Sequence, residues 1–306
     1  MRTYLLSRLG LSVLVVWGVL TLVFIILRLS GDPAVLMLPL GATEEQINEF
    51  RHQMGFDRPL PIQYWQFLHR AARLDFGESL RFQQPALPLV LERLPATAQL
   101  AFTALSMAIL IGTTAAVLAV VYRGTALEFV AMVVALLGQA TPVFWLGIML
   151  ILVFAVQLRW LPSGGRGTLE HMVLPAFTLA AYSSASIARL FRSSLLEVMG
   201  EDYVRTARAK GLSNKVVFLR HIVRNALLPV VTMVGLQAGT LLGGSVVTET
   251  VFSWPGVGRL TVQAIYNRDF PLVQASVAVL AITFVVINLL VDLLYAAIDP
   301  RIRLKS

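Results

Sequence analysis

The side chains of this sequence that could carry chemistry gather in one segment, residues 189–224, which holds eight of the 25 lysines and arginines. Up to Lys210 the apolar residues recur every three to four positions, as they do on one face of a helix. Gly211 suits the position just after a helix end, where a left-handed residue costs little, and Ser213 suits the N-cap of a second helix. This basic segment therefore predicts two short amphipathic helices at an angle, suited either to an anionic lipid surface or to a partner protein.

Spacing defines the apolar stripes of these two predicted helices. The first stripe consists of Leu196, Met199, Tyr203 and Ala207. The second stripe consists of Val216, Leu219, Val223 and Ala226. Because the charged residues fall outside both stripes, we expect a rigid element with one packed face and one basic face.

Catalytic motifs are missing from the sequence. It contains no cysteine, which excludes a disulfide framework, a thiolate nucleophile and a cysteine-based metal site. It contains neither a G-x-x-x-x-G-K-[ST] phosphate-binding loop nor an H-E-x-x-H motif, and Gly243-Gly-Ser-Val246 lacks the closing glycine of a nucleophile turn. We therefore expect a chain that is not an enzyme and binds no cofactor. A shared metal site is not expected either, because the four histidines are scattered: His52, His69, His171 and His221.

The composition indicates the medium in which these elements fold. Hydrophobic residues make up 57% of the 306 positions and charged residues only 14%, against about 25% charged in an average soluble protein. A soluble globule of this length needs more surface charge, and a disordered chain needs low hydrophobicity, so both classes are excluded. The net charge of +8 would suggest nucleic acid in a soluble protein, but its placement here points to a membrane, and no nucleic-acid partner is expected.

Six runs without any Asp, Glu, Lys or Arg are long enough to cross a bilayer, which takes about 20 mostly apolar residues. They should be helical, because a lone strand cannot satisfy its backbone amides in lipid. Pro142 interrupts the third run, so we expect a kink or a break there. The sequence predicts an all-α, polytopic membrane protein with six transmembrane helices, at Leu9–Leu27, Leu94–Tyr122, Phe129–Leu158, His171–Ala188, Asn225–Thr248 and Phe270–Val291.

The distribution of lysine and arginine predicts the orientation of these helices. With the N-terminus inside, the cytoplasmic parts hold 14 of these residues and the short outer loops hold 4. Both termini are therefore expected in the cytoplasm. The long segment Arg28–Arg93 then lies outside, where Thr43 should cap a short helix at Glu44–Met54.

A second outer region, Glu249–Asp269, is a loop rich in turn residues, and its part Val251–Arg259 is expected to be an ordered element at the external mouth. Its Trp254 should lie at the membrane interface, where an amphipathic indole is favoured. Pro255 and Gly256 should make the turn of this loop.

The basic segment contains the run Glu201-Asp-Tyr-Val-Arg-Thr-Ala-Arg-Ala-Lys-Gly211, followed by Arg224-Asn-Ala-Leu-Leu-Pro229. These runs resemble the E-A-A-x3-G…L-P loop of ABC importer permeases, and above all the version found in the dipeptide/oligopeptide/nickel branch, which includes glutathione-type permeases. Arg205 stands where the general motif has Glu, a departure that is usual for this branch. Further family signatures extend the resemblance to nearly the whole chain: Gly31-Asp-Pro-Ala34, Asp75-Phe-Gly-Glu-Ser79, Val251-Phe-Ser-Trp-Pro-Gly-Val-Gly-Arg259 and Asp299-Pro-Arg301.

The resemblance implies a type I ABC importer permease fold in a bacterial cytoplasmic (inner) membrane. The transmembrane core would occupy residues 94–298, after an N-terminal part, residues 1–93, made of one transmembrane helix and an extracytoplasmic segment. The implied partners are a second homologous permease, two ABC ATPase subunits that bind the ATP, and an extracytoplasmic substrate-binding protein.

The same resemblance implies that residues 189–224 form a cytoplasmic coupling loop that docks in a cleft of an ATPase subunit. Closure of two ATPase subunits would then switch the helix bundle from inward- to outward-facing. Ala207 would be small enough for close approach and Gly211 would set the angle between the helices. The residues expected to form this docking surface are Asp202, Tyr203, Arg205, Thr206, Ala207, Arg208, Lys210 and Gly211.

The expected cargo is a di- or oligopeptide or glutathione, with nickel or another chelated solute as the alternative within the family. A secondary transporter driven by ions is the alternative from a different class. Such transporters usually bury ionised residues near the middle of the membrane, whereas the predicted spans here contain none.

The fifth predicted span carries glycines at every fourth position, Gly235, Gly239 and Gly243, which allow helix backbones to approach closely. This face serves either packing inside the subunit or the pathway and the partner permease. Gln237 lies beside it and needs a hydrogen-bond partner in hydrocarbon. Interhelical hydrogen bonds are likewise expected for Gln99, Gln139 and Asn288.

Overall fold

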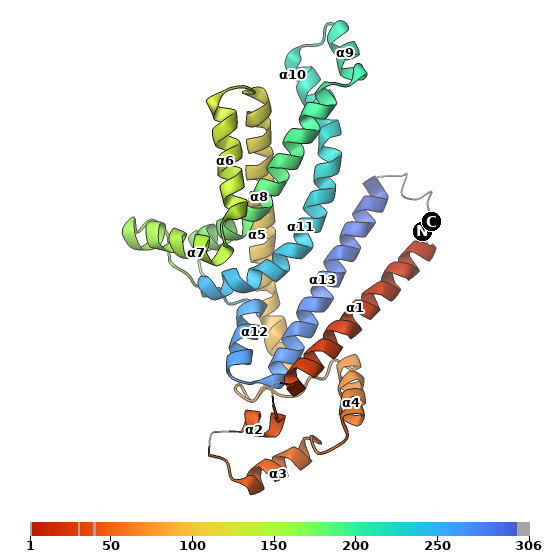
Figure 1. Ribbon diagram of the computed structural model, residues 1–306, viewed down its shortest axis with the longest axis vertical. Coiled ribbons are helices and arrows are strands. Elements are labelled where there is room, and N and C mark those ends of the chain that lie inside the picture. The colour runs from red at the N-terminus through yellow and green to blue at the C-terminus, as the bar shows by residue number, and fades with distance from the viewer. Residues whose placement is uncertain (1, 30, 39–40, 299–306) are drawn as a thin grey trace. The chain divides into compact units, whose positions relative to one another are not determined.

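The computed structural model describes residues 2–29, 31–38 and 41–298, so the Asp299-Pro-Arg301 signature lies outside the described residues. Within these ranges the chain is helical, and its β-type pairing is limited to one antiparallel bridge between Glu78 and Pro85. This confirms the predicted all-α class. The helices in chain order are α1 (Arg2–Leu29), α2 (Pro33–Met37), α3 (Glu44–Gln53), α4 (Leu60–Ala72), α5 (Ala86–Val121), α6 (Ala126–Ala140), α7 (Val143–Leu150), the π-helix η1 (Ile151–Gln157), α8 (Glu170–Met199), α9 (Asp202–Ala209), α10 (Asn214–Val216), the π-helix η2 (Val217–Val223), α11 (Arg224–Val251), α12 (Val257–Tyr266) and α13 (Phe270–Ile298) (Figure 1).

The chain forms two compact units. The first unit consists of Met1–Thr97 together with Pro255–Ser306, and the second consists of Ala98–Trp254. These two units are defined by the contacts within each of them. The predicted boundary between residues 93 and 94 separates an N-terminal part from a transmembrane core, which is a different division, and it stays a prediction.

In the first unit, α1 packs along α13, and α12 packs against α13 (Figure 1). The buried core includes Phe76, Val90 and Leu272, while many large apolar side chains of α1 remain exposed. Thr43 caps α3 in a capping box with Gln46: its hydroxyl accepts from the Gln46 amide, and the Gln46 side chain accepts from the Thr43 amide. The predicted helix after Thr43 is therefore confirmed.

The second unit is organised around α8, which packs against α6, α7 and α11. Glycine permits this close packing: a Cβ at Gly112 of α5 would lie 2.7 Å from the Ser184 carbonyl oxygen. A Cβ at Gly138 of α6 would lie 3.2 Å from the Ala181 carbonyl oxygen. Most of α8 is buried, including hydroxyl-bearing side chains at Thr178, Ser183, Ser184 and Ser186.

Four helical stretches of the described residues are long and apolar enough to cross a membrane: Gly10–Leu29, Ala86–Val121, Asn214–Gly243 and Phe270–Leu293. The third predicted span is broken, because α6 and the α7–η1 stretch meet at 110°, and together they would form a fifth span. The expected break at Pro142 is thereby confirmed. By length and hydropathy, the described helices therefore do not reproduce the six predicted transmembrane helices. The fourth predicted span lies inside α8, a 30-residue helix whose hydroxyl groups lower its hydropathy.

The predicted outer loop Glu249–Asp269 is mostly helical, which corrects the sequence interpretation. The end of α11 and the whole of α12 occupy most of it. The tight turn lies at Ser253, whose φ is +51°, rather than at Pro255 and Gly256. Gly256 instead has an extended backbone and occupies the N-cap position of α12. Glycine is accepted at an N-cap, so a residue read as a turn marker begins a helix here.

Candidate functional site

The basic segment 189–224 forms an ordered turn of short helices. Gly200 caps the end of α8, and Glu201 has the extended backbone of an N-cap at the start of α9. Gly211 follows α9 with φ of +78°, the left-handed conformation expected of a residue just after a helix. Ser213 is the extended N-cap of α10. The helix end at Gly211 and the helix start at Ser213 are therefore confirmed.

The number and length of helices in this segment differ from the prediction. The apolar spacing from Leu196 to Ala207 suggested one helix, but Gly200 and Glu201 separate α8 from α9. The second element is not a short separate helix, because α10, η2 and α11 follow one another without a gap. Any movement of α9 is thus linked directly to the long helix α11.

The π-helical turn η2 also changes which face of the second helix is buried. Val217 and Ile222 are buried, whereas Val216 and Leu219 of the predicted stripe are exposed. The other two residues of that stripe fit the prediction, since Ala226 is buried and Val223 is partly buried. A π-helix bonds residues five apart instead of four, so an α-helical spacing rule assigns the wrong stripe across it.

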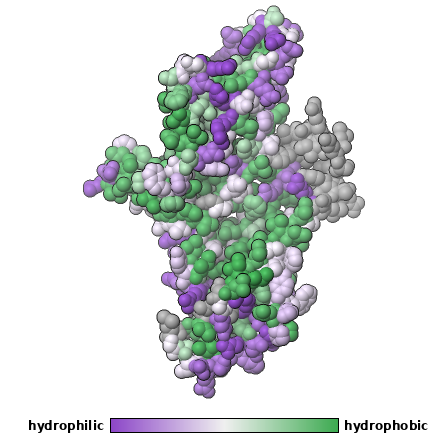
Figure 2. Space-filling view, in the orientation of Figure 1, coloured by the Kyte–Doolittle hydropathy of each residue, from purple (hydrophilic) through white to green (hydrophobic). Residues whose placement is uncertain are grey.

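Seven of the eight predicted docking residues are exposed on α9 or just after it, where hydrophilic side chains cover the surface (Figure 2). The exception is Ala207, which is 5% exposed and lies beside the buried Val204. Ala207 therefore packs α9 against its own chain, which corrects its expected role in close approach to a partner. The exposed seven are Asp202, Tyr203, Arg205, Thr206, Arg208, Lys210 and Gly211.

Next to α9 the surface is hollowed by a cavity of about 480 Å³. Met199, Phe218 and Ile222 provide apolar lining, and Arg208 and Lys215 provide positive charge. An apolar hollow flanked by cations is a surface to which an acidic, partly apolar partner element can bind.

An ion pair that the sequence interpretation missed connects α8 to the start of α6. Arg192 donates to Oε1 of Glu128 through Nε at 3.1 Å and also through Nη2. Glu128 Oε2 accepts from the backbone amide of Gly124 at 2.7 Å. Both charged side chains are partly buried, and the pair holds α8 seven residues before its end. Residues 64 positions apart give no local signal, which explains the omission.

Gln237 is the one lone polar residue of the predicted spans whose expected interhelical bond the structure confirms. Its buried Oε1 accepts from Ser183 of α8 at 3.2 Å and from Thr240 at 2.9 Å. Gln99 instead accepts from Arg166 in a loop at 2.8 Å, and Asn288 donates to its own helix at the Phe284 carbonyl. For Gln139, Oε1 is buried and has no hydrogen-bond partner among the described residues.

The three glycines of α11 do not share one environment. Gly239 is buried and Gly235 is partly buried, whereas Gly243 is exposed and a Cβ there would meet nothing within 4 Å. The predicted glycine face is therefore packed inside this chain only in part. Its exposed end at Gly243 leaves the alternatives of pathway and partner permease open.

Trp254 is buried inside the second unit, so its ring packs against protein, and its place at the membrane interface stays a prediction. It is 1% exposed, and the Arg166 guanidinium lies 5.9 Å from its ring centroid. Its backbone amide donates to the Glu249 carbonyl at 2.8 Å, and the neighbouring Phe252 carbonyl accepts from Gly165. This turn is therefore a packed element that joins α11 to the loop after η1.

Among the described residues, no group of three or more His, Asp or Glu side chains is placed to hold a metal ion.

Comparison with known proteins gives a consistent result over the whole chain. A family model described as "Binding-protein-dependent transport system inner membrane component" matches residues 92–304, and its N-terminal counterpart matches residues 1–101. The chain is 43% identical over 306 residues to the glutathione transport system permease protein GsiC of Escherichia coli strain K12, with 100% of both chains covered. The same protein of Shigella flexneri serotype 5b is also 43% identical over 306 residues.

Two solved structures share the fold at low sequence identity. The inward-facing MetNI methionine ABC transporter matches with a TM-score of 0.55 and 21% identity, over 69% of this chain and 96% of that chain. An amino acid ABC transporter with histidines matches with a TM-score of 0.54 and 19% identity, over 69% of this chain and 94% of that chain. At this level of identity the likeness concerns the fold alone.

Proposed function

Because the chain belongs to the family of binding-protein-dependent transport system inner membrane components, we propose that it works as the permease subunit of an ATP-driven importer for glutathione or for di- and oligopeptides. The choice of cargo is supported by the 43% identity, over the full length, to a glutathione transport permease. The ordered, exposed α9 supports the coupling part of the proposal. The chain itself contributes helices and a docking surface rather than a catalytic group.

The proposed assembly contains a second homologous permease, two ABC ATPase subunits and an extracytoplasmic substrate-binding protein. ATP binds to the ATPase subunits in this proposal, and this chain holds no cofactor. The chain is a multi-pass protein of the cytoplasmic membrane, with both termini and α9 on the cytoplasmic side and α2–α4 outside.

In the proposed mechanism, one of the two ATPase subunits receives α9 in a cleft. Arg205, Arg208 and Lys210 are exposed and positive, so they steer and hold an acidic cleft. Gly211 in its left-handed conformation sets the direction in which α10 leaves. Since α10, η2 and α11 form one uninterrupted helical stretch, displacement of α9 is transmitted to α11 and its neighbour α8.

The first prediction tests α9 as the coupling element through a double substitution, Tyr203→Ala with Arg205→Ala. Both side chains are exposed, so the variant should insert and fold normally. It should retain less than about a tenth of the wild-type ATP-dependent uptake, because losing two contact residues costs on the order of 1–3 kcal/mol of docking energy. The measurements are co-purification of the ATPase subunits and peptide uptake in proteoliposomes.

A matched control carries the same two losses at Tyr122→Ala with Arg123→Ala, at the end of α5. Both of these side chains are also exposed, and the proposal places them on the same side of the membrane. If the basic segment merely rests on anionic lipid, the two double variants should be impaired equally. Equal uptake in the two variants, or wild-type uptake in the α9 variant, would contradict the coupling role.

A further inference from the structure

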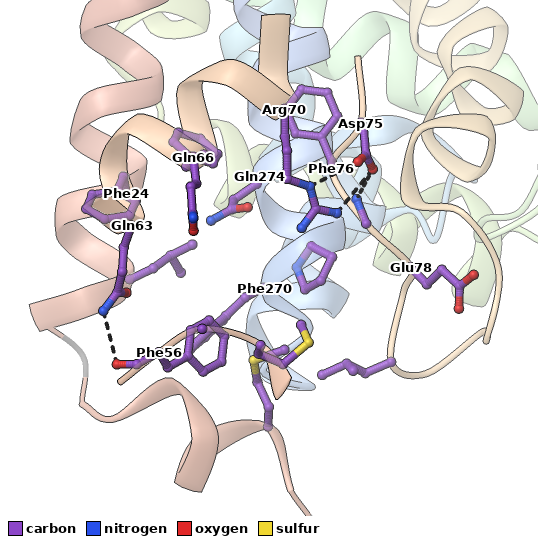
Figure 3. Close-up of a pocket in the computed structure, with 18 of the residues that line it drawn as sticks. Phe24, Phe56, Gln63, Gln66, Arg70, Asp75, Phe76, Glu78, Phe270 and Gln274 are labelled. Atoms are coloured by element: carbon purple, nitrogen blue, oxygen red, sulfur yellow. Dashed lines mark hydrogen bonds and ion pairs between the residues drawn. The ribbon is translucent and has the colours of Figure 1, made fainter. Parts of the chain in front are cut away.

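A cavity of about 620 Å³ lies inside the first unit, between the C-terminal end of α1, α3, α4, the segment before α5 and the start of α13 (Figure 3). Aromatic rings line much of it, among them Phe24, Phe56, Phe76 and Phe270. A volume in the range of about 300–1,000 Å³ is typical of small-molecule sites. Charged and amide side chains share the lining with these rings. Neither α9 nor the helices that pack around it contribute to this cavity.

One polar group of the lining lacks a partner. Gln63 is 8% exposed, and its Nε2 donates to the carbonyl oxygens of Phe56 at 3.0 Å and Arg58 at 2.6 Å. Two carbonyl acceptors fix the orientation of the amide, because turning it over would place oxygen against oxygen. The other atom, Oε1, is left buried and has no hydrogen-bond donor among the described residues. A buried acceptor without a donor costs about 1–3 kcal/mol, so a ligand with an N–H group would be favoured here.

Positive charge lies beside this acceptor. The Arg28 guanidinium stacks over the rings of Phe24, at 5.2 Å from the centroid, and Phe56, at 4.7 Å. Phe56 is thus shared: its ring contacts Arg28 and its carbonyl contacts Gln63. A guanidinium held by aromatic faces keeps its N–H donors for a carboxylate.

Two further amides and an ion pair complete the polar lining. Gln66 and Gln274 extend towards the cavity from α4 and α13 (Figure 3). Arg70 and Asp75 form a two-armed ion pair, with distances of 2.9 and 3.2 Å, at the rim. Amide side chains can both donate and accept, which is the requirement of a peptide bond.

We propose that this cavity binds a short peptide with at least one apolar side chain. A peptide N–H donates to Gln63 Oε1, the carboxylate meets Arg28, and the apolar side chain packs among the phenylalanine rings. A lipid acyl chain would fill the aromatic part but offers no N–H donor to Gln63. The inference rests on the proposed function, because an importer of peptides exposes α2–α4 to peptides that arrive from outside.

The test uses the whole transporter in nanodiscs and isothermal titration calorimetry with the dipeptide Phe-Leu. Arg28→Gln should weaken binding at least tenfold, and Gln66→Met at least threefold. Gln63→Met removes the unpartnered oxygen but also the two hydrogen bonds that Gln63 donates to the backbone. Its binding is therefore interpreted only together with that of the other two variants. The matched controls are Arg81→Gln, an arginine that contacts the ring of Phe82 outside the cavity, and Gln53→Met on the exposed face of α3.

Controls that bind as tightly as the wild type, together with the weakened variants, support the site. A Phe-Leu amide that binds as tightly as free Phe-Leu would overturn the role of Arg28, and equal binding by all variants would overturn the site. Native mass spectrometry that finds the cavity occupied by a phospholipid, lost only in Arg28→Gln, would also overturn it. Peptide uptake is measured in parallel: uptake without cavity binding refutes this inference alone, and cavity binding without uptake refutes the proposed function alone.

Discussion

Helices α1 and α8 are of similar length but differ in almost every other respect. Along α1, large apolar side chains such as Leu14, Trp17 and Leu22 are exposed. Along α8, hydroxyl-bearing residues such as Ser183 and Ser186 are buried. A helix that faces lipid has no partners for polar groups and must be apolar, whereas a helix enclosed by other helices can bury hydroxyls and approach them closely.

Hydropathy therefore follows how exposed these two helices are rather than how many helices each one contacts. The most apolar stretch of α1 passes the test for a membrane span, and α8 does not. Yet α8 touches α6, α7 and α11, holds Gln237 through Ser183 and holds Glu128 through Arg192. The less hydrophobic helix is the one that organises its unit.

The largest effect is expected when leucine replaces a glycine at a close helix contact, and the same replacement at a glycine without near neighbours is its control. Gly112→Leu on α5 would put its Cβ 2.7 Å from the Ser184 carbonyl oxygen and 2.9 Å from Ile187, so the two backbones must separate. We expect destabilisation at or above the upper end of the range of about 1–3 kcal/mol for overpacking. Gly18→Leu on α1 meets nothing within 4 Å and should be neutral or slightly stabilising.

The measurement for this pair is the melting temperature of the purified transporter and its level in membranes. A lower melting temperature and a lower level in Gly112→Leu alone would sharpen the contrast between an enclosed helix contact and a lipid-facing helix. Equal values for the two variants would mean that α5 and α8 do not meet closely in the assembled protein.

A smaller effect is expected from the ion pair that α8 makes with α6. Glu128→Gln keeps the shape of the side chain but removes the charge that Arg192 contacts, and the amide of Gly124 then faces a weaker acceptor. Asp202→Asn is the matched control, because Asp202 pairs with Arg205 at 3.3 Å while both side chains remain mostly exposed. Exposed pairs contribute little to stability.

We expect Glu128→Gln to lower the melting temperature measurably, by less than Gly112→Leu, and Asp202→Asn to leave it unchanged. Peptide uptake per ATP hydrolysed should also fall in Glu128→Gln, since the pair fixes α8 close to α9 in the sequence. If Glu128→Gln melts at the same temperature as the wild type, the ion pair does not stabilise the position of α8.

Local patterns in the sequence predicted several features correctly. They include the capped helix after Thr43, the break at Pro142, the left-handed Gly211 and the N-cap at Ser213. Each depends on residues within a few positions, where backbone sterics and capping act. The exposure of Asp202, Arg205, Arg208 and Lys210 also follows from their charge, whereas their docking role stays a prediction.

Features set by distant contacts or unusual helical periods could not be predicted in this way. The π-turn η2 exposed two of the four residues of the predicted stripe, Val216 and Leu219, and no residue type marks such a turn. Trp254 was expected at an interface from its amphipathic ring, but long-range packing buries it. The cavity around Gln63 combines residues from α1 to α13, so no sequence window contains it.

The smallest effect is expected at the solvent-exposed ion pair of the first unit, between Asp75 and Arg70. The hydrogen bond from Arg70 is the main reason that the pKa of Asp75 lies below its ordinary value. A lowered pKa in the folded state adds stability above the unfolded value of about 3.9, and this stability disappears as the pH falls through the folded pKa. Both side chains are about half exposed, so the contribution at pH 7 should stay below about 1 kcal/mol. Asp75→Asn should therefore lower the melting temperature slightly and equally from pH 5 to pH 8, and the difference from the wild type should shrink as the pH falls through the lowered pKa of Asp75. Ser183→Ala on α8 removes a contact between uncharged groups, so its cost should not change with pH in the same melting series. A pH-dependent cost for Ser183→Ala, or a pH-independent one for Asp75→Asn down to the lowest pH, would reverse the assignment of a charged contact to Asp75 and an uncharged one to Ser183.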